Sequence, residues 1–560
     1  MEASLRRGAA KEFSRAFRRA KKVAARQPEL AVDWCRYAAS LAWTVNPGFF
    51  YCHETEQLLA EIGRAHLGSA PSQVSSMDPP RRFLHVMSAA HEKGGHTRVV
   101  SRWINICAQC APLEQHSILI SMQKDHPLPT WLGQSAQKTG GELIIFPSGM
   151  TWLQVAAEVR SRSLEFDVVV LHMHPNDPSP NIAFYDQPRP VLYYRHADHL
   201  FNLGLDVARV VADFRPVGHE MSVHFCAKAQ RKIMLPIPLF DEELAHCSKL
   251  EAREKLGLPV DSLVALTIGG AVKFIPMQGY SFPAVVQSLC DGNNRVLVIA
   301  VGISDSEPFP GLRESVGGRF LPVGPIEDRE ILELYYRAAD VYMDSYPDGS
   351  LTAVLDAARH SLPVQRLRNP YRCLMWCDDP ALDSVMRGAS TQEEFAAGVL
   401  EWLAWPEEQR SRLGGRFRDA VLLDHCGASW KKNWLDPGVA SLTMTGGGVS
   451  DSTSDNGQRD EANYPGLGIA GPENDWPAGM FVAGTLLVDD RIPRSIRISG
   501  AFHSIKPLLF QKLGGGTTRR RFMMMRALVL SCLPMWIRMP VRKIRSAIFK
   551  KPRHQRESVD

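Results

Sequence analysis

The 560-residue chain lacks the features that mark a membrane-spanning protein. It contains no run of 18 apolar residues, and a run of about that length is what a helix needs to cross a bilayer. Its N-terminus is basic and amphipathic, without the apolar segment of a signal peptide. These absences predict a cytoplasmic protein, or one that is peripheral on the cytosolic face of a membrane.

Cysteine spacing also gives no sign of disulfide bonds or of a metal site. The 11 cysteines are an odd number scattered through a long chain, which argues against a disulfide framework. Cys107 and Cys110 have two residues between them, but no second pair with zinc-like spacing accompanies them. We therefore expect buried thiols here and predict no metal ligands.

Charge of one sign is concentrated at the end of the chain. Residues 491–560 carry 17 basic and 2 acidic side chains, net +15, whereas the preceding residues carry 48 basic and 58 acidic side chains, net −10. Residues 437–478 are mainly Gly, Ser, Thr, Asp and Asn, which predicts a disordered linker. It leads into a basic, amphipathic tail, 479–560.

Within this tail, an apolar stretch at 522–537 is flanked by arginines and lysines. That pattern favours a helix lying on an anionic membrane surface. A solvated tail is one alternative. Nucleic-acid binding is another, although the tail lacks the interleaved aromatic residues that would stack on bases.

The remaining chain predicts an α/β protein with a helical extension. Residues 1–80 show helical spacing of apolar residues, at 29–43 and 54–66 in particular. After them, short apolar runs alternate with helical patterns, which predicts doubly wound parallel sheets. We place an N-terminal domain at 81–237 and a C-terminal domain at 238–436. The expected strands are 83–87, 117–121, 143–146, 168–172, 191–194, 207–214, 263–268, 295–301, 318–323 and 340–343.

The most informative stretch follows the strand that ends at Met343. Pro347–Ser350 has the composition of a turn, and a helix is expected from Thr352 to His360. A small-residue loop that leads into a helix N-terminus offers unpaired N–H groups and a partial positive charge, which suit a phosphate. Asp356 lies one turn into this helix, with seven residues between it and Asp348. An ordinary strand–helix unit with a capped helix is the alternative interpretation.

This stretch resembles the signature of retaining glycosyltransferases with two Rossmann-like domains, the GT-B type of family 4. That signature has two glutamates with seven residues between them, followed by Ala and by Gly-x-Pro-Val. Here the two carboxylates are Asp348 and Asp356, and the trailing segment ends in Leu362-Pro363-Val364 with Ser361 before it. The resemblance implies two Rossmann-like domains that face each other across a cleft.

The resemblance also assigns residues that bind the donor. The loop after the strand 263–268 and the turn at 348–352 would hold the diphosphate, and Asp356 would bind the ribose. Lys273 takes the role that the family gives to an Arg and a Lys. The implied donor-binding residues of the C-terminal domain are Gly269, Gly270, Lys273, Gly349, Ser350, Leu351, Thr352 and Asp356.

The N-terminal domain supplies two further candidate groups. Gly94 and Gly95 follow the first expected strand and resemble the glycine-rich acceptor-side loop of the same enzymes. His196 and Asp198 follow the strand 191–194, where titratable side chains are well placed to act on a ligand. We expect His196, Asp198 and Asp348 to be catalytic. A structural polar cluster and a metal site are the alternatives for the histidine segment.

These features together imply a glycosyltransferase with a nucleotide-sugar donor and a glycan, lipid-linked or other acceptor. No Asp-x-Asp triplet is present, which agrees with metal-independent chemistry, so no cofactor is expected. A GT-B epimerase that cleaves and re-adds the nucleotide is one alternative. A degenerate, membrane-associated scaffold without catalysis is the other.

Overall fold

The computed structural model describes residues 2–44, 47–69, 81–92, 95–123, 127–225, 231–239, 247–276, 279–304, 308–326, 328–368 and 378–443. Gly94, most of the expected linker and the whole basic tail lie outside these residues. No helix within the described ranges is long and apolar enough to span a bilayer.

The first sheet has seven parallel strands in the order β3-β2-β1-β4-β5-β6-β7. Its strands are buried on both faces, as the run of four apolar residues from Val168 to Leu171 illustrates. The strands are β1 (Arg82–Met87), β2 (Gln115–Ile120), β3 (Leu143–Ile145), β4 (Val168–His172), β5 (Val191–Arg195), β6 (Val210–Asp213) and β7 (Arg231–Met234). Its helices are α4 (Gly95–Cys110), α5 (Thr130–Lys138), α6 (Trp152–Ser163), α7 (Ser179–Ala183) and α8 (Pro216–Phe225).

The second sheet has five parallel strands in the order β10-β9-β8-β11-β12. These are β8 (Leu263–Ile268), β9 (Val296–Val301), β10 (Phe320–Gly324), β11 (Val341–Met343) and β12 (Val364–Gln365). The helices around it are α9 (Lys249–Leu256), η1 (Ala271–Phe274), α10 (Phe282–Gly292), α11 (Leu312–Ser315), α12 (Arg329–Ala338), α13 (Leu351–Arg359), α14 (Pro380–Val385), α15 (Gln392–Ala404) and α16 (Glu407–His425). The predicted α/β class with two Rossmann-like sheets is confirmed.

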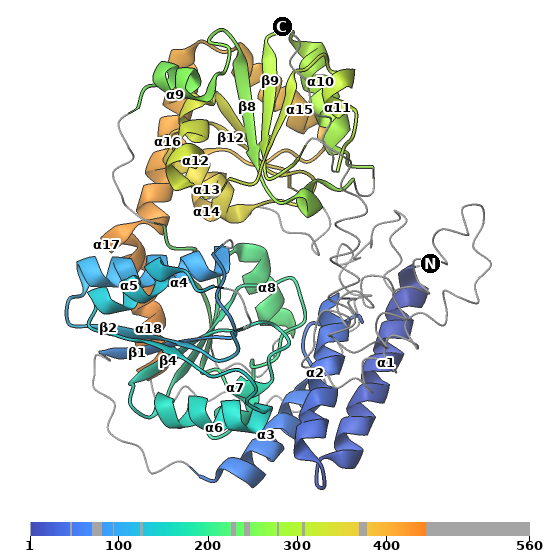
Figure 1. The fold of residues 1–560 in the computed structure, drawn as a ribbon, viewed down its shortest axis with the longest axis vertical. Helices are drawn as coiled ribbons and strands as arrows, with labels where there is room; N and C mark the ends of the chain where they lie inside the picture. Colours follow the sequence, from blue (N-terminus) through green and yellow to red (C-terminus); the bar gives the residue numbers. More distant parts are fainter. Residues whose placement is uncertain are drawn as a thin grey trace, which may run out of the picture.

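The N-terminal helices belong to the first unit rather than standing apart from it. These are α1 (Glu2–Val23), α2 (Pro28–Thr44) and α3 (His53–Leu67). Helix α3 lies beside α6 and α7, α2 also contacts α6, and α1 packs on α2 (Figure 1). Phe13, Val32 and Leu59 from these helices share one apolar core with Val169 and Leu171 of β4. The helices therefore extend the hydrophobic layer on one face of the sheet.

The end of the described chain returns from the second unit to the first (Figure 1). It consists of α17 (Gly427–Trp430), the π-helical turn η2 (Lys431–Leu435) and α18 (Asp436–Thr443). Leu442 is fully buried, and Arg209 donates to its carbonyl oxygen over 2.7 Å. Residues 437–443 are therefore helical, although their composition predicted the start of a linker, because packing on the first sheet outweighs local propensity.

Trp430 is the main contact of this returning segment. Its ring is fully buried 5.7 Å from that of Trp103 in α4, and its Nε1–H donates to the Pro236 carbonyl oxygen over 2.7 Å. We expect Trp430→Ala to lower the free energy of unfolding by about 3–5 kcal/mol, because it leaves a cavity and an unpaired carbonyl.

Urea denaturation followed by circular dichroism measures this loss. Leu423→Ala on α16 is the control, since Leu423 is 59% exposed and its truncation should change the unfolding free energy by about 0.5 kcal/mol or less. Equal effects of the two substitutions would show that Trp430 does not hold the returning segment in place.

Candidate functional site

The carboxyl ends of the two sheets meet at the start of α4 and the start of α13. In each sheet the strand order reverses at one point, between β1 and β4 and between β8 and β11. Ligands of open α/β sheets bind at such points, beyond the carboxyl ends of the strands. A Cβ atom on Gly95, the first residue of α4, would lie 3.4 Å from the side chain of Thr352 in α13. The predicted acceptor-side loop and the predicted phosphate loop therefore face each other.

The loop that leads into α13 is shaped by Asp344, directly after β11. Its Oδ1 accepts from the backbone N–H groups of Ser345 and Ser350, both over 2.8 Å, and from the Ser350 hydroxyl over 3.1 Å. The Ser350 side chain is thereby held away from the helix, which it does not cap. The backbone N–H groups of Leu351, Thr352 and Ala353 have no hydrogen-bond partner in the described part of the chain.

Lys273 brings a positive charge to this loop. It lies in η1, just after Gly269 and Gly270, and its ammonium group donates to the Gly349 carbonyl oxygen and lies 3.6 Å from Oδ2 of Asp348. Oδ1 of Asp348 is buried without a partner among the described residues. Lysine, carboxylate and helix N-terminus thus converge on one place, as the sequence predicted.

The glycines after β8 allow the backbone to approach closely. A Cβ atom on Gly269 would lie 3.0 Å from Cβ of Ser345, and one on Gly302 would lie 2.2 Å from the Gly269 carbonyl oxygen. Gly270 has open space around it. A ligand can therefore lie against the backbone at Gly270, while Gly269 serves the packing of the loop.

Asp356 forms an ion pair that crosses between the two units. Arg102 of α4 reaches it through Nη2, which lies 3.0 Å from both carboxylate oxygens. Burial raises the pKa of Asp356, but Arg102, together with Arg359 and His360, outweighs this effect and holds the pKa below its usual value. The Asp356 side chain is still 23% exposed, so the carboxylate is open to a ligand on its other side.

His196 and Asp198 have different surroundings although they are two residues apart. His196 is half-buried, and its Nε2 lies 2.9 Å from Nδ1 of His172. Asp198 is fully buried in a two-pronged ion pair with Arg215, at 2.6 and 2.8 Å, and also contacts His199 over 3.2 Å. Despite its burial, the Arg215 guanidinium holds the pKa of Asp198 low. Asp198 orients His199 and, among the described residues, makes no hydrogen bond to His196, so its catalytic role stays a prediction.

Three groups escaped the sequence prediction. Asp344 follows β11 directly and is closer to it than Asp348 is, so its position at a strand end was a usable signal. Arg102 is 254 positions from its partner, and no local pattern points to it. His85, His116 and His172 lie on three different apolar strands, and only the pairing register of β1, β2 and β4 places them on one face.

Two Rossmann-like parallel sheets that face each other in this way, with a C-terminal segment that returns to the first, form the GT-B architecture. The predicted resemblance is confirmed at the level of the fold. No protein-family model matches the chain, and no curated protein matches its sequence.

Several solved structures are similar to this chain. Anabaena HepE in complex with UDP and glucose is 11% identical over 64% of this chain and 100% of that one, with a TM-score of 0.49. A Rickettsia africae glycosyltransferase is 13% identical over 65% and 100%, also with a TM-score of 0.49. A mutant Thermobaculum terrenum O-GlcNAc transferase is 14% identical over 78% and 80%, with a TM-score of 0.46. At such low identity the likeness concerns the fold, and the chemistry of the site follows from its own residues.

The burial of Asp344 predicts how stability depends on pH. Burial raises the pKa of Asp344 from 3.8 to about 6. As the pH rises from 3.8 to about 6, this carboxyl group ionises first in the unfolded chain, so the folded state loses stability. Asp344→Asn keeps an oxygen for the three hydrogen bonds and cannot ionise. We expect it to raise the free energy of unfolding at pH 7.5 by about 2 kcal/mol.

Chemical denaturation of both proteins at pH 4.5 and pH 7.5 tests this expectation. The gain should be clearly smaller at pH 4.5, where the native carboxyl group is largely protonated in the parent protein. The same gain at both pH values would contradict a raised pKa.

Proposed function

We propose that the protein is a glycosyltransferase that moves a sugar from a nucleotide-sugar donor to a hydroxyl group of an acceptor. The observation that carries this proposal is the convergence, between two facing Rossmann-like sheets, of an open helix N-terminus, Lys273 and two carboxylates. Each of these groups matches one part of a nucleotide-sugar. Helix N–H groups and an ammonium group bind phosphate, and carboxylates accept hydrogen bonds from hydroxyl groups.

The donor would lie mainly on the second sheet. Its diphosphate would contact Gly270, Lys273 and the amides at Leu351 and Thr352. The ribose would donate to Asp356, whose carboxylate keeps unused lone pairs beside Arg102. The transferred sugar would then lie near Asp348, whose buried Oδ1 lacks a partner among the described residues.

The reaction needs stabilisation of the departing diphosphate. The bond from the anomeric carbon to the diphosphate oxygen breaks, and its electron pair leaves with the diphosphate. The acceptor oxygen forms the new bond and loses its proton. Lys273 and the α13 amides would stabilise the growing negative charge, which preorganised donors do well in a site shielded from water. A retaining, metal-independent course is the version implied by the resemblance.

The acceptor would approach from the first sheet, past Gly95 and His196. We propose a glycan or lipid-linked acceptor in the synthesis of cell-surface polysaccharide or glycoconjugates, with the basic tail placing the protein on an anionic membrane surface. An epimerase remains a second candidate, because Asp348 and His196 lie on the two sheets at the facing loops.

Lys273→Met tests the donor site. Losing a charge-assisted hydrogen bond should weaken the binding of a nucleoside diphosphate about 10- to 100-fold. Calorimetric titration with UDP, GDP, ADP and TDP measures the affinity and identifies the base. Lys255→Met removes the same charge from an exposed position on α9 and should leave the affinity unchanged. Equal affinities of the parent protein, Lys273→Met and Lys255→Met would show that Lys273 does not contribute to nucleotide binding.

A product assay separates the candidate functions. With the preferred nucleotide-sugar and added acceptors, a transferase makes a glycosylated acceptor, whereas an epimerase alters the sugar without using the acceptor. We expect transfer, lost in Asp356→Ala and reduced in His196→Ala. A protein that binds none of the four nucleotides would instead be a scaffold.

A further inference from the structure

Four histidines form a diagonal line across one face of the first sheet. His116 lies on β2, His85 on β1 and His172 on β4, and His196 follows the last residue of β5. His116 pairs in register with Phe83, two residues before His85, and His172 pairs with Met87, two residues after it. The line therefore climbs towards the carboxyl edge of the sheet, where the candidate site lies.

Neighbouring rings in this line are joined by hydrogen bonds. Nε2 of His85 lies 2.9 Å from Nδ1 of His116, and Nε2 of His172 lies 3.0 Å from Nδ1 of His85. Nε2 of His196 lies 2.9 Å from Nδ1 of His172. At the far end, Nε2 of His116 lies 3.3 Å from a carboxylate oxygen of Glu114. Each of these contacts joins the Nε2 atom of one histidine to Nδ1 of the next or, at the end of the line, to the Glu114 carboxylate.

The carboxylate end gives the whole line a direction. Burial raises the pKa of Glu114, but hydrogen bonds from His116 and Lys431 outweigh this effect and leave the pKa below its usual value. An ionised carboxylate only accepts, so His116 must carry its hydrogen on Nε2. Its Nδ1 then accepts from Nε2–H of His85. In the same way, Nδ1 of His85 accepts from His172, and Nδ1 of His172 accepts from His196. All four rings carry hydrogen on Nε2, which leaves a lone pair on Nδ1 of His196.

The surroundings keep these rings neutral. Burial lowers the pKa of His85, His172 and His196 well below the usual value, and neighbouring histidines lower it further. Burial also lowers the pKa of His116, against the opposing effect of Glu114. The other groups that face the line are His96, Tyr194 and Lys431. The first two are neutral at pH 7, because burial lowers the pKa of His96 to about 4 and raises that of Tyr194.

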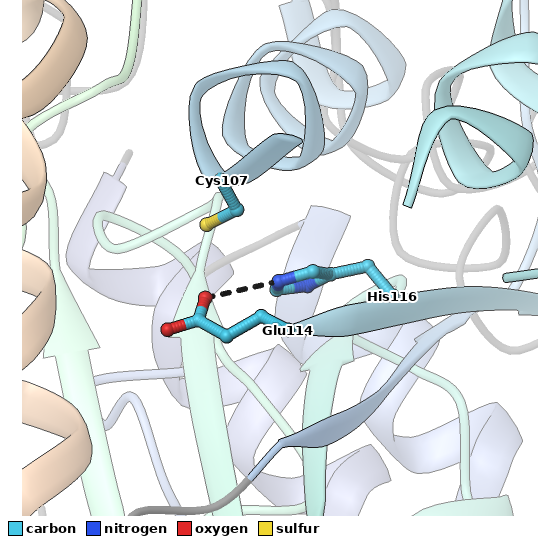
Figure 2. A group of neighbouring side chains, drawn as sticks. All are labelled: Cys107, Glu114 and His116. Atoms are coloured by element: carbon cyan, nitrogen blue, oxygen red, sulfur yellow. Dashed lines mark hydrogen bonds and ion pairs between the residues drawn. The ribbon is translucent and has the colours of Figure 1, made fainter. Parts of the chain in front are cut away.

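The Glu114 end also has the composition of a metal site, with Cys107 above Glu114 and His116 (Figure 2). One possible ligand atom from each of the three lies within 4.8 Å of the others. However, the Lys431 ammonium group lies 2.9 Å from Glu114, so this carboxylate already pairs with a cation. A cation beside the carboxylate repels a metal ion. We therefore assign this cluster to the histidine line.

We propose that Glu114, His116, His85 and His172 are positioning residues that fix the tautomer of His196, so that its Nδ1 accepts a hydrogen bond or proton from a substrate hydroxyl group. This inference rests on the proposed function and gives the expected catalytic residue His196 the role of an acceptor. Buried polar groups cost more than apolar ones of the same shape, so stability alone does not account for four histidines on an apolar face.

Two observations concern the lone pair of His196, which lies beside the start of α4. Its Nδ1 has no hydrogen-bond partner among the described residues, although the ring is only half-buried. His96, next to Gly95, stacks edge-on against it with 4.2 Å between ring centres.

When His196 takes the acceptor proton on Nδ1, the acceptor oxygen binds the anomeric carbon and the diphosphate leaves with its electron pair. The proton passes from His196 to water after the product leaves.

Nitrogen NMR of the unliganded full chain with ¹⁵N-labelled histidine is the first test. We expect His85, His116, His172 and His196 to be neutral at pH 7 with hydrogen on Nε2, each assigned by its loss in a single variant. A hydrogen on Nδ1 of His196, or a charged ring there, overturns the proposal. This measurement needs no substrate, so its result does not depend on whether the protein transfers a sugar.

Glu114→Gln is the second test, because an amide can donate as well as accept and no longer sets a direction. We expect mixed tautomers at His196, a fall in kcat of about tenfold to a hundredfold with an unchanged donor KM, and a shift of the acid limb of the pH–rate profile to lower pH. Asp436→Asn is the matched control. It removes a carboxylate 2.5 Å from the same Lys431 but outside the line, and should leave tautomers and kcat unchanged. Unchanged tautomers in Glu114→Gln would overturn the proposal.

Discussion

The two sheets can contact one ligand because the chain crosses between them twice at the same place. The first crossing, at residues 235–239, lies against the second, at 425–430. Leu239 donates its N–H to the His425 carbonyl oxygen over 2.8 Å, and Nδ1 of His425 lies 2.7 Å from the Ile237 carbonyl oxygen. Asp379 raises the pKa of the buried His425, which strengthens its role as a donor. The paired crossings limit how the units can turn and keep their carboxyl ends facing.

The parts of the fold that the sequence predicted are those where local pattern and burial agree. The apolar runs at 168–172 and 263–268 are β4 and β8 with the predicted bounds, because both faces of these strands are covered. The strand β7 was missed, since its sequence begins Arg-Lys and one side of it is the edge of the sheet. Helix α18 was missed because only its packing on the first sheet outweighs a linker-like composition.

In the candidate site, too, only the features set by local sequence could be predicted. The loop before α13 was predictable, since a turn and a helix start are local features, and Lys273 follows a strand by a few residues. Arg102 was not, because its partner Asp356 belongs to the other unit. The role of Glu114 was not predictable either, although its contact His116 is only two positions away. Arg102 meets Asp356 only when both units are folded and facing. Glu114 matters through three hydrogen-bonded rings that lie on three different strands.

Burial distinguishes the two arginine–aspartate pairs near the cleft. The Asp198–Arg215 pair has no exposed surface, so it holds the loop after β5 and has no free face for a ligand. In the other pair, the Asp356 side chain is 23% exposed. A carboxylate offers about four acceptor positions, and Arg102 takes two of them. A ribose bound to Asp356 would therefore meet a carboxylate oriented from across the cleft, which would couple nucleotide affinity to closure of the two units.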